Sequence, residues 1–390
     1  MDQKTDLREN KHKKSYKKLK ITMFIIVLFL ICGGGYTWFL VNKASSAVQN
    51  ASQNLERGEK SELREQAVKP VSNNVSVLIM GIDENQGREK EYSGAFHPDA
   101  LLLATFNKDN KTVKLVSIPR DTYTYIPVEK KKDKITNSYS LGVAKNGKDS
   151  GPQSTIDAVE KLFNVPVDYF VRFNFKSFIK IVDDLGGIDL DVPVTFTEQD
   201  SNDTAGAIHL EKGFQHLNGE QSLALARTRK IDSDAMRGQR QQIVIEAIVK
   251  KLASAGSITK VGKIIDDING EFKTNFSFDD MLSFYKYGID SSIGKLQLAG
   301  EDCYMSAEDK ICKPNPAPKH TYYYMPDQKN IADITKQLRE HLGLPADANS
   351  VSQDKDMNTD KTKDPDKKQN QEDKQQPAQK NTATSETSEN

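Results

Sequence analysis

NGEQSLALARTRKIDSDAMRGQRQQIVIEAIVKKLASA, residues 218–255, is the stretch that says most about the fold and the function of this chain. Asn218 followed by Gln221 is a capping-box pattern, which indicates that a short helix begins here. That helix is expected to end near Arg227. A basic segment follows it and leads into a second, longer helix.

The second helix is expected to begin near Asp234 and to stop at Gly256, because an apolar stripe of helical period runs between these residues. The macrodipole favours an anion at the N-terminus of a helix, so polar groups on its first turns are candidates for anion binding. Arg237, Arg240 and Gln241 share one face of these turns. The apolar stripe consists of Ile245, Ile248, Val249 and Leu252.

Four of the eleven arginines of the chain lie between Arg227 and Arg240, although its other basic residues are 44 lysines. Because a guanidinium group can bind an oxyanion through two parallel hydrogen bonds, this cluster suggests a phosphate-binding site. If Arg227 and Arg229 lie on extended chain, their side chains point the same way. The alternative is a solvated charged face, or ion pairs with Asp232 and Asp234.

The N-terminus has the pattern of a membrane anchor. Residues 1–20 carry eight Lys or Arg and three Asp or Glu, and the uncharged run of residues 21–41 follows. Twenty-one helical residues, at about 1.5 Å each, just span the hydrocarbon core of a bilayer. The basic flank predicts a cytoplasmic N-terminus and an extracellular remainder. A cleaved signal peptide is the alternative, but the run is longer than a usual signal core and no A-x-A site directly follows it.

Three regions of different composition follow the predicted transmembrane helix. Residues 42–74 are polar, and we expect a membrane-proximal helix or spacer without chemistry of its own. Residues 75–344 have a globular composition and are numerous enough for one large domain. Residues 345–390 form a polar tail that lacks Leu, Ile, Phe, Tyr and Trp from 351 onward. We therefore expect the tail to be disordered, and its removal to leave folding and turnover intact.

The formal net charge of zero conceals an asymmetry between these regions. The head carries +5 and residues 351–390 carry −2, so about −3 remains on the external globular part. A negative domain disfavours non-specific binding of nucleic acid. Any anion that is recognised outside the membrane must therefore be recognised locally, by the arginine cluster.

Strand and helix patterns alternate along the globular region. Strands interleaved with amphipathic helices predict an α/β fold in which helices sandwich a mixed β-sheet. Strands are expected at Ser76–Asp83, Ala100–Asn107, Thr112–Ile118, Val167–Phe173 and Ile188–Val194. Helices are expected at Gln153–Phe163, Phe175–Leu185 and Asn330–His341.

Acidic and basic residues stand at the ends of the first three predicted strands. Asp83 follows the first strand and Asp99 precedes the second, so the two carboxylates could converge on a divalent cation if these strands are neighbours. Taken alone, an acid in such a position is more often a turn residue or a helix cap. Arg120 and Asp121 end the third strand, and either could form a structural ion pair.

Cys303 and Cys312 are the two cysteines beyond the predicted anchor. An oxidising compartment would allow them to pair, and closing this short loop would contribute ~2.5–3 kcal/mol through loop entropy. Two free thiols are the alternative. A metal site would need more ligands than these two cysteines provide.

Six motifs follow one another along the globular region: SVLIMGID, the HPD before LLLATFN, SIPRD, KDKIT, LNGEQSLALARTRK and RGQRQ. In this order, after one predicted membrane anchor, they closely resemble the LytR-CpsA-Psr family over residues 75–344. The spaced SDAMRGQRQ variant is most similar to the Bacillus-type wall teichoic acid transferases. Two departures concern arginines of the family, since Asn85 stands in place of one and His97-Pro98-Asp99 replaces Arg-Ser-Asp.

The resemblance implies an extracytoplasmic phosphotransferase that moves an anionic glycopolymer from a polyprenyl pyrophosphate carrier onto peptidoglycan through a phosphodiester. It implies an LCP-type fold with a long apolar pocket for the lipid, and Mg²⁺, with Mn²⁺ as the alternative, at Asp83 and Asp99. It also implies that Arg120, beside Asp121, is the catalytic arginine. The pyrophosphate is then bound by Arg227, Arg229, Arg237 and Gln241, with Lys134 and Arg240 as supporting contacts.

Two other functions are compatible with an arginine cluster. A non-catalytic envelope regulator or polyanion-binding module needs the arginines but no metal and no paired acids. A lipid-pyrophosphate pyrophosphatase would release the polymer to water instead of linking it to the wall. No Ser-His-Asp or Cys-His set is evident in the sequence, so hydrolysis through a nucleophilic triad is not expected.

Overall fold

The computed structural model describes residues 42–43, 45–83, 96–228, 231, 234–253, 264, 267–268, 271–290, 292–306 and 308–346. The predicted transmembrane run at 21–41 lies outside the described residues, as do Asn85, Arg229 and nearly all of the predicted tail. In the described part of the chain, no helix is both long enough and apolar enough to cross a bilayer. The description thus covers most of the predicted globular domain and of the segment that precedes it.

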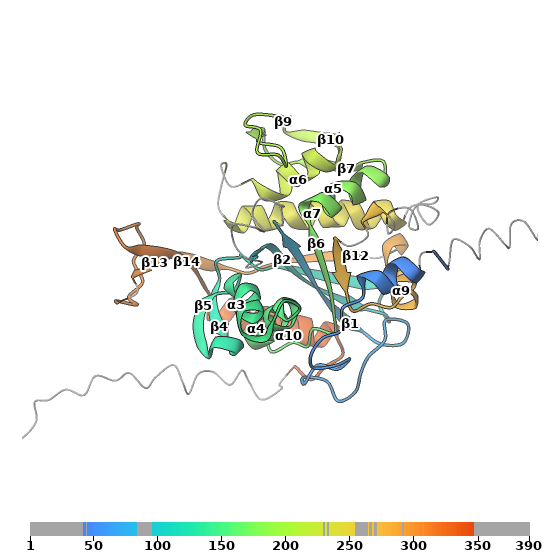
Figure 1. Cartoon of the computed structure of the whole chain (residues 1–390), viewed down its shortest axis with the longest axis horizontal. Coiled ribbons are helices and arrows are strands. Elements are labelled where there is room, and N and C mark those ends of the chain that lie inside the picture. Colours follow the sequence, from blue (N-terminus) through green and yellow to red (C-terminus); the bar gives the residue numbers. More distant parts are fainter. Residues whose placement is uncertain are drawn as a thin grey trace, which may run out of the picture. The chain divides into compact units, whose positions relative to one another are not determined.

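A six-stranded mixed β-sheet forms the middle layer of the domain (Figure 1). Its strands are β1 (Val75–Ile82), β2 (Pro98–Asn107), β3 (Thr112–Ser117), β6 (Tyr169–Asn174), β11 (Phe272–Thr274) and β12 (Ser292–Gln297). They lie in the order β11-β6-β1-β2-β3-β12. Strands β1 and β6, and likewise β3 and β12, are parallel, whereas β1–β2, β2–β3 and β6–β11 are antiparallel. The predicted mixed sheet is confirmed.

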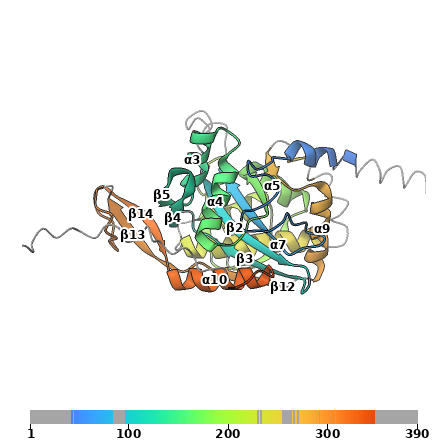
Figure 2. The ribbon, with the colours of Figure 1, turned by 90° about the horizontal axis from the view of Figure 1, so that it is seen from below.

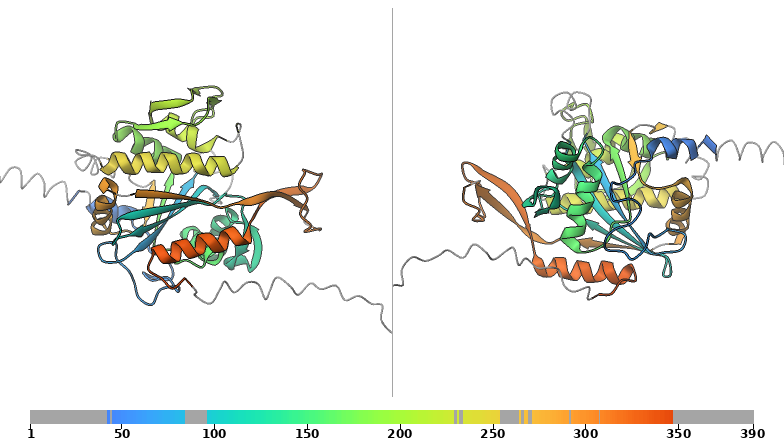
Figure 3. Two further views of the ribbon diagram at one scale, coloured as in Figure 1. Left: turned by 180° about the vertical axis from the view of Figure 1, so that it is seen from behind. Right: turned by 60° about the horizontal axis from the view of Figure 1, so that its bottom comes forward.

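Helices α4 (Gly151–Phe163) and α10 (Gln328–His341) cover one face of this sheet (Figures 1 and 3). Leu78 and Met80 of β1 belong to the same buried cluster as Ile156 of α4 and Leu338 of α10. Helix α3 (Asn137–Asn146) packs against α4. The two helices that the sequence predicts here are therefore present, and they bury the even-numbered side of β1.

Helix α7 (Asp234–Ala253) lies across the opposite face of the sheet (Figure 3). The side chain of Gln242 is buried, and its Nε2 donates to the carbonyl oxygens of Leu296 at 2.9 Å and Leu115 at 3.3 Å, so α7 is tied to β12 and β3. Because helices cover both faces, β1 is apolar except for Ser76. Helix α9 (Phe278–Asp290) packs beside α7.

A further layer packs on the outer side of α7 (Figure 1). Its helices are α5 (Phe175–Asp184) and α6 (Gly219–Arg227). Its strands form two antiparallel pairs, β7 (Ile188–Val192) with β10 (Gly213–Leu217), and β8 (Phe196–Glu198) with β9 (Ile208–Leu210). The predicted capping box opens α6, since Asn218 Oδ1 accepts from Gln221 N at 2.9 Å and Gln221 Oε1 accepts from Asn218 N at 3.0 Å.

The segment expected to be a spacer packs against the domain. Arg57 pairs with Glu160 at 2.9 Å, and Arg64 binds the buried carboxylate of Asp168 through two N–H groups, at 3.0 and 2.7 Å. Asp168 also accepts from the backbone N–H of Ser76 at 2.9 Å. The two arginines lie more than a hundred residues from the carboxylates that they bind, which is why the composition of the segment alone did not reveal that it packs.

Two hairpins lie at one end of the sheet. The first joins β4 (Tyr123–Ile126) to β5 (Lys131–Lys134) through η1 (Pro127–Glu129). The second pairs β13 (Gly300–Ser306) with β14 (His320–Pro326), and we call this pair, with the described residues between its strands, the arm. The arm projects beyond the sheet (Figure 2). Cys303 and Cys312 form a disulfide within it, with their Cα atoms 5.2 Å apart, as the sequence allowed.

Candidate active site

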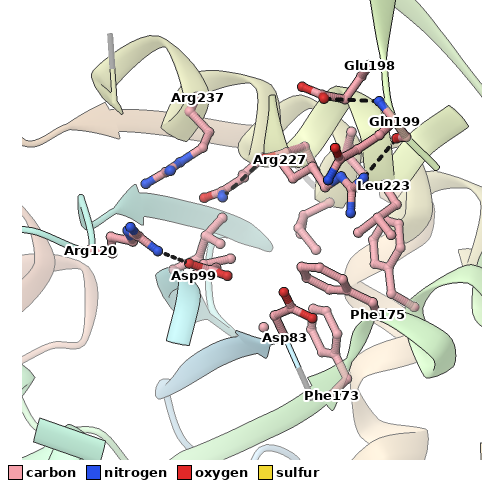
Figure 4. Close-up of a pocket in the computed structure, with 18 of the residues that line it drawn as sticks. Asp83, Asp99, Arg120, Phe173, Phe175, Glu198, Gln199, Leu223, Arg227 and Arg237 are labelled. Atoms are coloured by element: carbon pink, nitrogen blue, oxygen red, sulfur yellow. Dashed lines mark hydrogen bonds and ion pairs between the residues drawn. The ribbon is translucent and has the colours of Figure 1, made fainter. Parts of the chain in front are cut away.

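A pocket of about 430 Å³ lies between the sheet and the helices above it, and most of the predicted site residues line it (Figure 4). The ends of β1, β2 and β6 provide one wall, and α5, α6 and α7 provide the other. The polar lining residues are Asp83, Asp99, Arg120, Glu198, Gln199, Asp203, Arg227, Arg237 and Gln241. The remaining ones are Gly81, Ala100, Leu102, Phe173, Phe175, Phe178, Leu223, Ala226, Val244 and Ile245.

The two predicted metal-binding acids both line this pocket. Asp83 follows β1 and Asp99 lies near the start of β2, and these strands are neighbours in the sheet. Arg120 comes from the loop after β3, and its Nη1 donates to Asp99 Oδ1. The side chains of Arg120 and Asp99 are 28% and 29% exposed, so this ion pair remains accessible from the pocket.

Asp121 and Lys134 lie behind Arg120 rather than in the pocket lining. The carboxylate of Asp121 is buried, with Oδ2 at 3.5 Å from Arg120 Nε and Oδ1 at 2.7 Å from Lys134 Nζ. A buried carboxylate is stable in its charged form when cations pair with it. Asp121 is therefore placed to orient Arg120 by holding it between two carboxylates.

Arg227 lines the pocket, but it does so from a helix. The sequence suggested extended chain at this residue, whereas Thr228 N donates to Ala224 O at 3.1 Å and closes the last turn of α6 around it. The expected alternation with Arg229 is therefore wrong for Arg227, and Arg229 itself lies outside the described residues. Arg227 Nη2 donates to the carbonyl oxygens of Gln199 at 2.8 Å and Asp200 at 2.6 Å, so its guanidinium group is held at the rim.

The polar residues on the first turns of α7 lie in two different places, the pocket lining and the contact with α6. Arg237 and Gln241, four residues apart, both line the pocket, as the predicted shared face requires. Arg240 is not in the lining. The residue is 1% exposed, and its guanidinium group donates from Nε to Leu225 O at 3.1 Å and from Nη2 to Thr228 O at 2.7 Å. Arg240 therefore joins α7 to the C-terminal end of α6.

Gly238 explains how Arg237 comes close to Arg120. A Cβ atom built on Gly238 would lie 2.4 Å from Ser117 Oγ, so the start of α7 touches the end of β3. Arg120 follows β3 directly, and Figure 4 shows Arg120 and Arg237 facing the same space. A side chain at residue 238 would collide with Ser117 and would push the start of α7 away from the end of β3. The sequence gives this glycine only as part of RGQRQ, with no sign of its neighbour.

His97 stands where the family carries an arginine, and it does not replace the missing charge. Burial lowers the pKa of His97, the charge of Asp99 raises it and that of Arg120 lowers it, with a net decrease. The imidazole is therefore neutral at neutral pH. Its Nε2 lies 3.2 Å from Ser140 Oγ. The other departure, Asn85, lies outside the described residues.

Apolar side chains form the part of the pocket wall that the sequence did not single out. Phe173 and Phe175 lie beside Asp83, as Figure 4 shows, and Phe178, Leu223 and Val244 extend the same wall. In the sequence these residues follow ordinary strand and helix periodicity, which does not distinguish a pocket wall from a core. Only the packing of α5 and α6 above β6 leaves them facing an open space.

Asp83 and Asp99 can hold a divalent cation only together with other ligands. Among the described residues, no group of three or more His, Cys, Asp and Glu side chains is arranged to hold a metal ion. Mg²⁺ commonly uses one or two carboxylates and completes its octahedron with water and substrate phosphate oxygens. Two carboxylates at the edge of an arginine-lined pocket fit this mode of binding.

The chain is similar to a family of known proteins and to solved structures within it. The LytR_cpsA_psr family model matches residues 38–340. The polyisoprenyl-teichoic acid–peptidoglycan teichoic acid transferase TagU of Bacillus licheniformis is 36% identical over 343 residues, which cover 86% of this chain and 99% of that protein. A structure of TagT bound to LIIa-WTA matches with a TM-score of 0.59 and 34% identity, over 75% of this chain and all of the other. A structure of TagT with bound octaprenyl pyrophosphate lipid matches with a TM-score of 0.54 and 31% identity, over the same shares.

Proposed function

The chain belongs to the LytR-CpsA-Psr family, and on this premise we propose that it transfers a polyprenyl-pyrophosphate-linked anionic glycopolymer, of the wall teichoic acid type, onto peptidoglycan. The observation that carries the proposal is one pocket with two kinds of wall. Arg120, Arg227 and Arg237 line it together with phenylalanines and other apolar side chains. A lipid pyrophosphate has the same two parts, a multiply charged group and an apolar chain.

The reaction exchanges one phosphorus–oxygen bond for another. A hydroxyl oxygen of peptidoglycan forms a bond to the phosphorus next to the glycopolymer, and the bond from this phosphorus to the bridging oxygen breaks. The polyprenyl monophosphate leaves with the bridging oxygen and both electrons of that bond, and the proton of the hydroxyl passes to water. The product is a phosphodiester between glycopolymer and peptidoglycan.

The residues of the pocket act mainly through charge and position in this reaction. Pyrophosphate brings several negative charges into the site, and the arginines neutralise them with donors that are fixed before the substrate arrives. The two neighbouring carboxylates of Asp121 and Asp99 hold the guanidinium of Arg120 in one orientation. Mg²⁺, bound by Asp83 and Asp99, would stabilise the charge on the phosphate oxygens as a Lewis acid.

Replacing Arg120 tests whether this residue is catalytic or only structural. If it neutralises the developing charge, Arg120→Ala should lower the rate of polymer transfer about 100- to 1000-fold with little change in melting temperature. Arg120→Lys should restore little, because an ammonium group cannot reproduce the guanidinium fork. The assay uses a synthetic lipid-pyrophosphate donor and peptidoglycan, with thermal melts of the same samples. Removing Mg²⁺ with a chelator should abolish transfer. The Asp83→Asn and Asp99→Asn variants should raise the Mg²⁺ concentration that transfer requires, or abolish transfer, without unfolding the domain.

Arg57 provides the matched control for this experiment. It also pairs with a carboxylate, that of Glu160, but far from the pocket lining, so Arg57→Ala should lower the melting temperature and leave transfer per folded molecule unchanged. Full specific activity of Arg120→Ala would rule out the catalytic role. Polymer released to water without linkage to peptidoglycan would instead identify the protein as a pyrophosphatase. Binding of donor without any turnover would support the non-catalytic module.

We further propose that residues 21–41 anchor the chain in the membrane once, with residues 1–20 in the cytoplasm and the pocket-bearing domain outside. The basic head and the uncharged run support this orientation. Such an anchor would keep the pocket close to a lipid-linked donor, and extracellular peptidoglycan would be within its reach.

A further inference from the structure

The arm begins directly beside the proposed active site. At its base, Tyr324 N donates to Asp121 O at 2.9 Å, and residue 324 bridges to Thr122 next to β4. Tyr324 is itself buried, and its hydroxyl donates to Leu298 O at 2.9 Å, which fixes the base of the arm to the sheet. The backbone of Asp121, whose carboxylate holds Arg120, is therefore bonded to the arm.

Four partly exposed tyrosines gather where the arm meets the hairpin of β4 and β5. We call Tyr123, Tyr304, Tyr322 and Tyr323 the tyrosine cluster. The rings of Tyr123 and Tyr323 meet edge to face with centroids 5.1 Å apart, and those of Tyr304 and Tyr322 lie 5.4 Å apart. Tyr322 and Tyr323 are consecutive residues of β14, so the two pairs of rings lie on opposite faces of the arm. The pairs come from β4, β13 and β14, and only the folded chain brings their members together.

Lys134 connects the tyrosine cluster to the active site. Its Nζ lies 5.5 Å from the ring centroid of Tyr323 and 6.0 Å from that of Tyr322, and the same atom pairs with Asp121 at 2.7 Å. Asp121 in turn contacts Arg120. One buried carboxylate therefore separates the rings from the arginine that faces the pocket, while the rings themselves are not part of the pocket lining.

The chemistry of the tyrosine cluster suits sugar rings better than an anionic polymer. Aromatic faces carry negative potential and attract the polarised C–H groups of a sugar, and phenolic hydroxyls exchange hydrogen bonds with its hydroxyls. The charges around the rings are mixed, since Lys134 is accompanied by Asp133 on β5 and by Asp302, which accepts from the Tyr322 hydroxyl at 2.8 Å. Burial, and then the charge of Asp133, raises the pKa of Tyr123 and of Tyr323, so both phenols stay neutral.

We propose that the tyrosine cluster binds the sugar rings of the acceptor glycan strand and directs one hydroxyl of that strand toward Arg120. This inference rests on the proposed function, because it assigns the acceptor of that reaction to a surface. The donor occupies the pocket, whereas the tyrosine cluster lies outside its lining, so the two substrates would bind to different surfaces on the two sides of Arg120. The disulfide and the backbone bonds between Tyr304 and Lys313 brace this part of the arm.

The test separates binding of the acceptor from binding of the donor. Tyr323→Leu removes the ring and keeps an apolar side chain, and Tyr323→Phe keeps the ring. With the full chain and a soluble, uncross-linked peptidoglycan strand as acceptor, we expect Tyr323→Leu to raise the acceptor KM about ten-fold, the equivalent of ~1.4 kcal/mol, and to leave the donor KM unchanged. Tyr323→Phe should restore most of the difference. Tyr322→Leu is the second variant, so the test does not depend on the folding of one protein.

Direct binding distinguishes this inference from the proposed function. Calorimetric titration of the donor-free protein with the same strand should show weaker binding for Tyr323→Leu, and no change for Phe214→Leu, which alters an exposed aromatic side chain on β10. If the strand binds through Tyr323 but no polymer is ever transferred, the proposed function fails and the acceptor site stands. Unchanged acceptor KM and unchanged strand binding in folded Tyr323→Leu and Tyr322→Leu would overturn the inference. The inference would also be overturned if these variants bound the strand normally and lost binding only to a soluble polyglycerol phosphate.

Discussion

Two arginines of α7 have different roles in this domain, and the groups around each side chain decide which. Arg237 and Arg240 are separated by less than one helical turn, and both are nearly inaccessible. Arg237 borders an open pocket, whereas the guanidinium of Arg240 is bonded to backbone carbonyl oxygens. A buried guanidinium that satisfies carbonyl groups stabilises the fold, and one that lines a cavity can contact an anion that is bound there.

His341 is the residue from which we expect a pH-dependent stability. Its ring is buried between Thr105 and Thr112, with each hydroxyl at 2.8 Å from a ring nitrogen. Burial, and then the charge of Lys114, lowers the pKa from 6.5 to about 4. Because the folded state binds the proton less tightly than the unfolded state, the contribution of this group is fully present above pH 6.5 and is lost as the pH falls toward 4. The loss should approach roughly 3 kcal/mol in the free energy of unfolding.

Denaturant unfolding of the wild type and of His341→Gln at several pH values measures this effect. The variant should be less dependent on pH between 6.5 and 4 than the wild type. His209→Gln is the control, since His209 is an exposed residue that contacts Glu211 and Thr197. Equal pH slopes for the wild type and His341→Gln would show that His341 does not titrate with folding.

At the scale of elements, the junction between α6 and α7 decides the shape of the arginine-lined wall. Arg240 donates to Leu225 and Thr228 and so fixes the end of α6 against the start of α7. Arg240→Met should leave these carbonyl groups without their donors and destabilise the domain by roughly 2–4 kcal/mol. The melting temperature should fall by about 5–10 °C. Thermal melts, together with donor binding measured well below the melting temperature, test this expectation.

Arg237→Met is the matched comparison on the same helix. It removes the same charge from a pocket-lining position, so it should weaken donor binding and change the melting temperature less than Arg240→Met does. If Arg240→Met weakened donor binding and left the melting temperature unchanged, Arg240 would be a direct substrate contact, as the family resemblance implies. The two variants together therefore assign the roles of the two arginines of α7 more firmly than either would alone.

At the scale of the whole molecule, function requires the domain, the membrane and the wall to be within reach of one another. The pocket lies between two layers of the domain, and the proposed anchor precedes it by about thirty residues that largely pack on its surface. Protease added to intact protoplasts should therefore digest the chain down to a small protected head, while a cytoplasmic protein in the same cells stays intact. Complete protection of the chain would contradict the proposed topology.

The sequence by itself determined the local features of this protein and its family. The capping box at Asn218 and the strand before Asp83 follow from nearest-neighbour chemistry and from the period of buried residues, and the ordered motifs identified the family. Much of the candidate site followed too, because Asp83 follows β1 and Asp99 lies near the start of β2, the next strand in the chain. These features need only residues that are close together in the chain.

Only the tertiary structure decided which surfaces meet. The apolar period of α5 and α6 shows that one face is buried, but not that part of it lines a pocket. Neither the bonds of Arg240 to Leu225 and Thr228 nor the contact of Gly238 with Ser117 could be predicted, since they depend on how separate elements pack. The tyrosine cluster likewise unites strands that lie nearly two hundred residues apart in the sequence. Periodicity fixes which face of an element is apolar, whereas the partner that covers it is chosen by the packing of the whole domain.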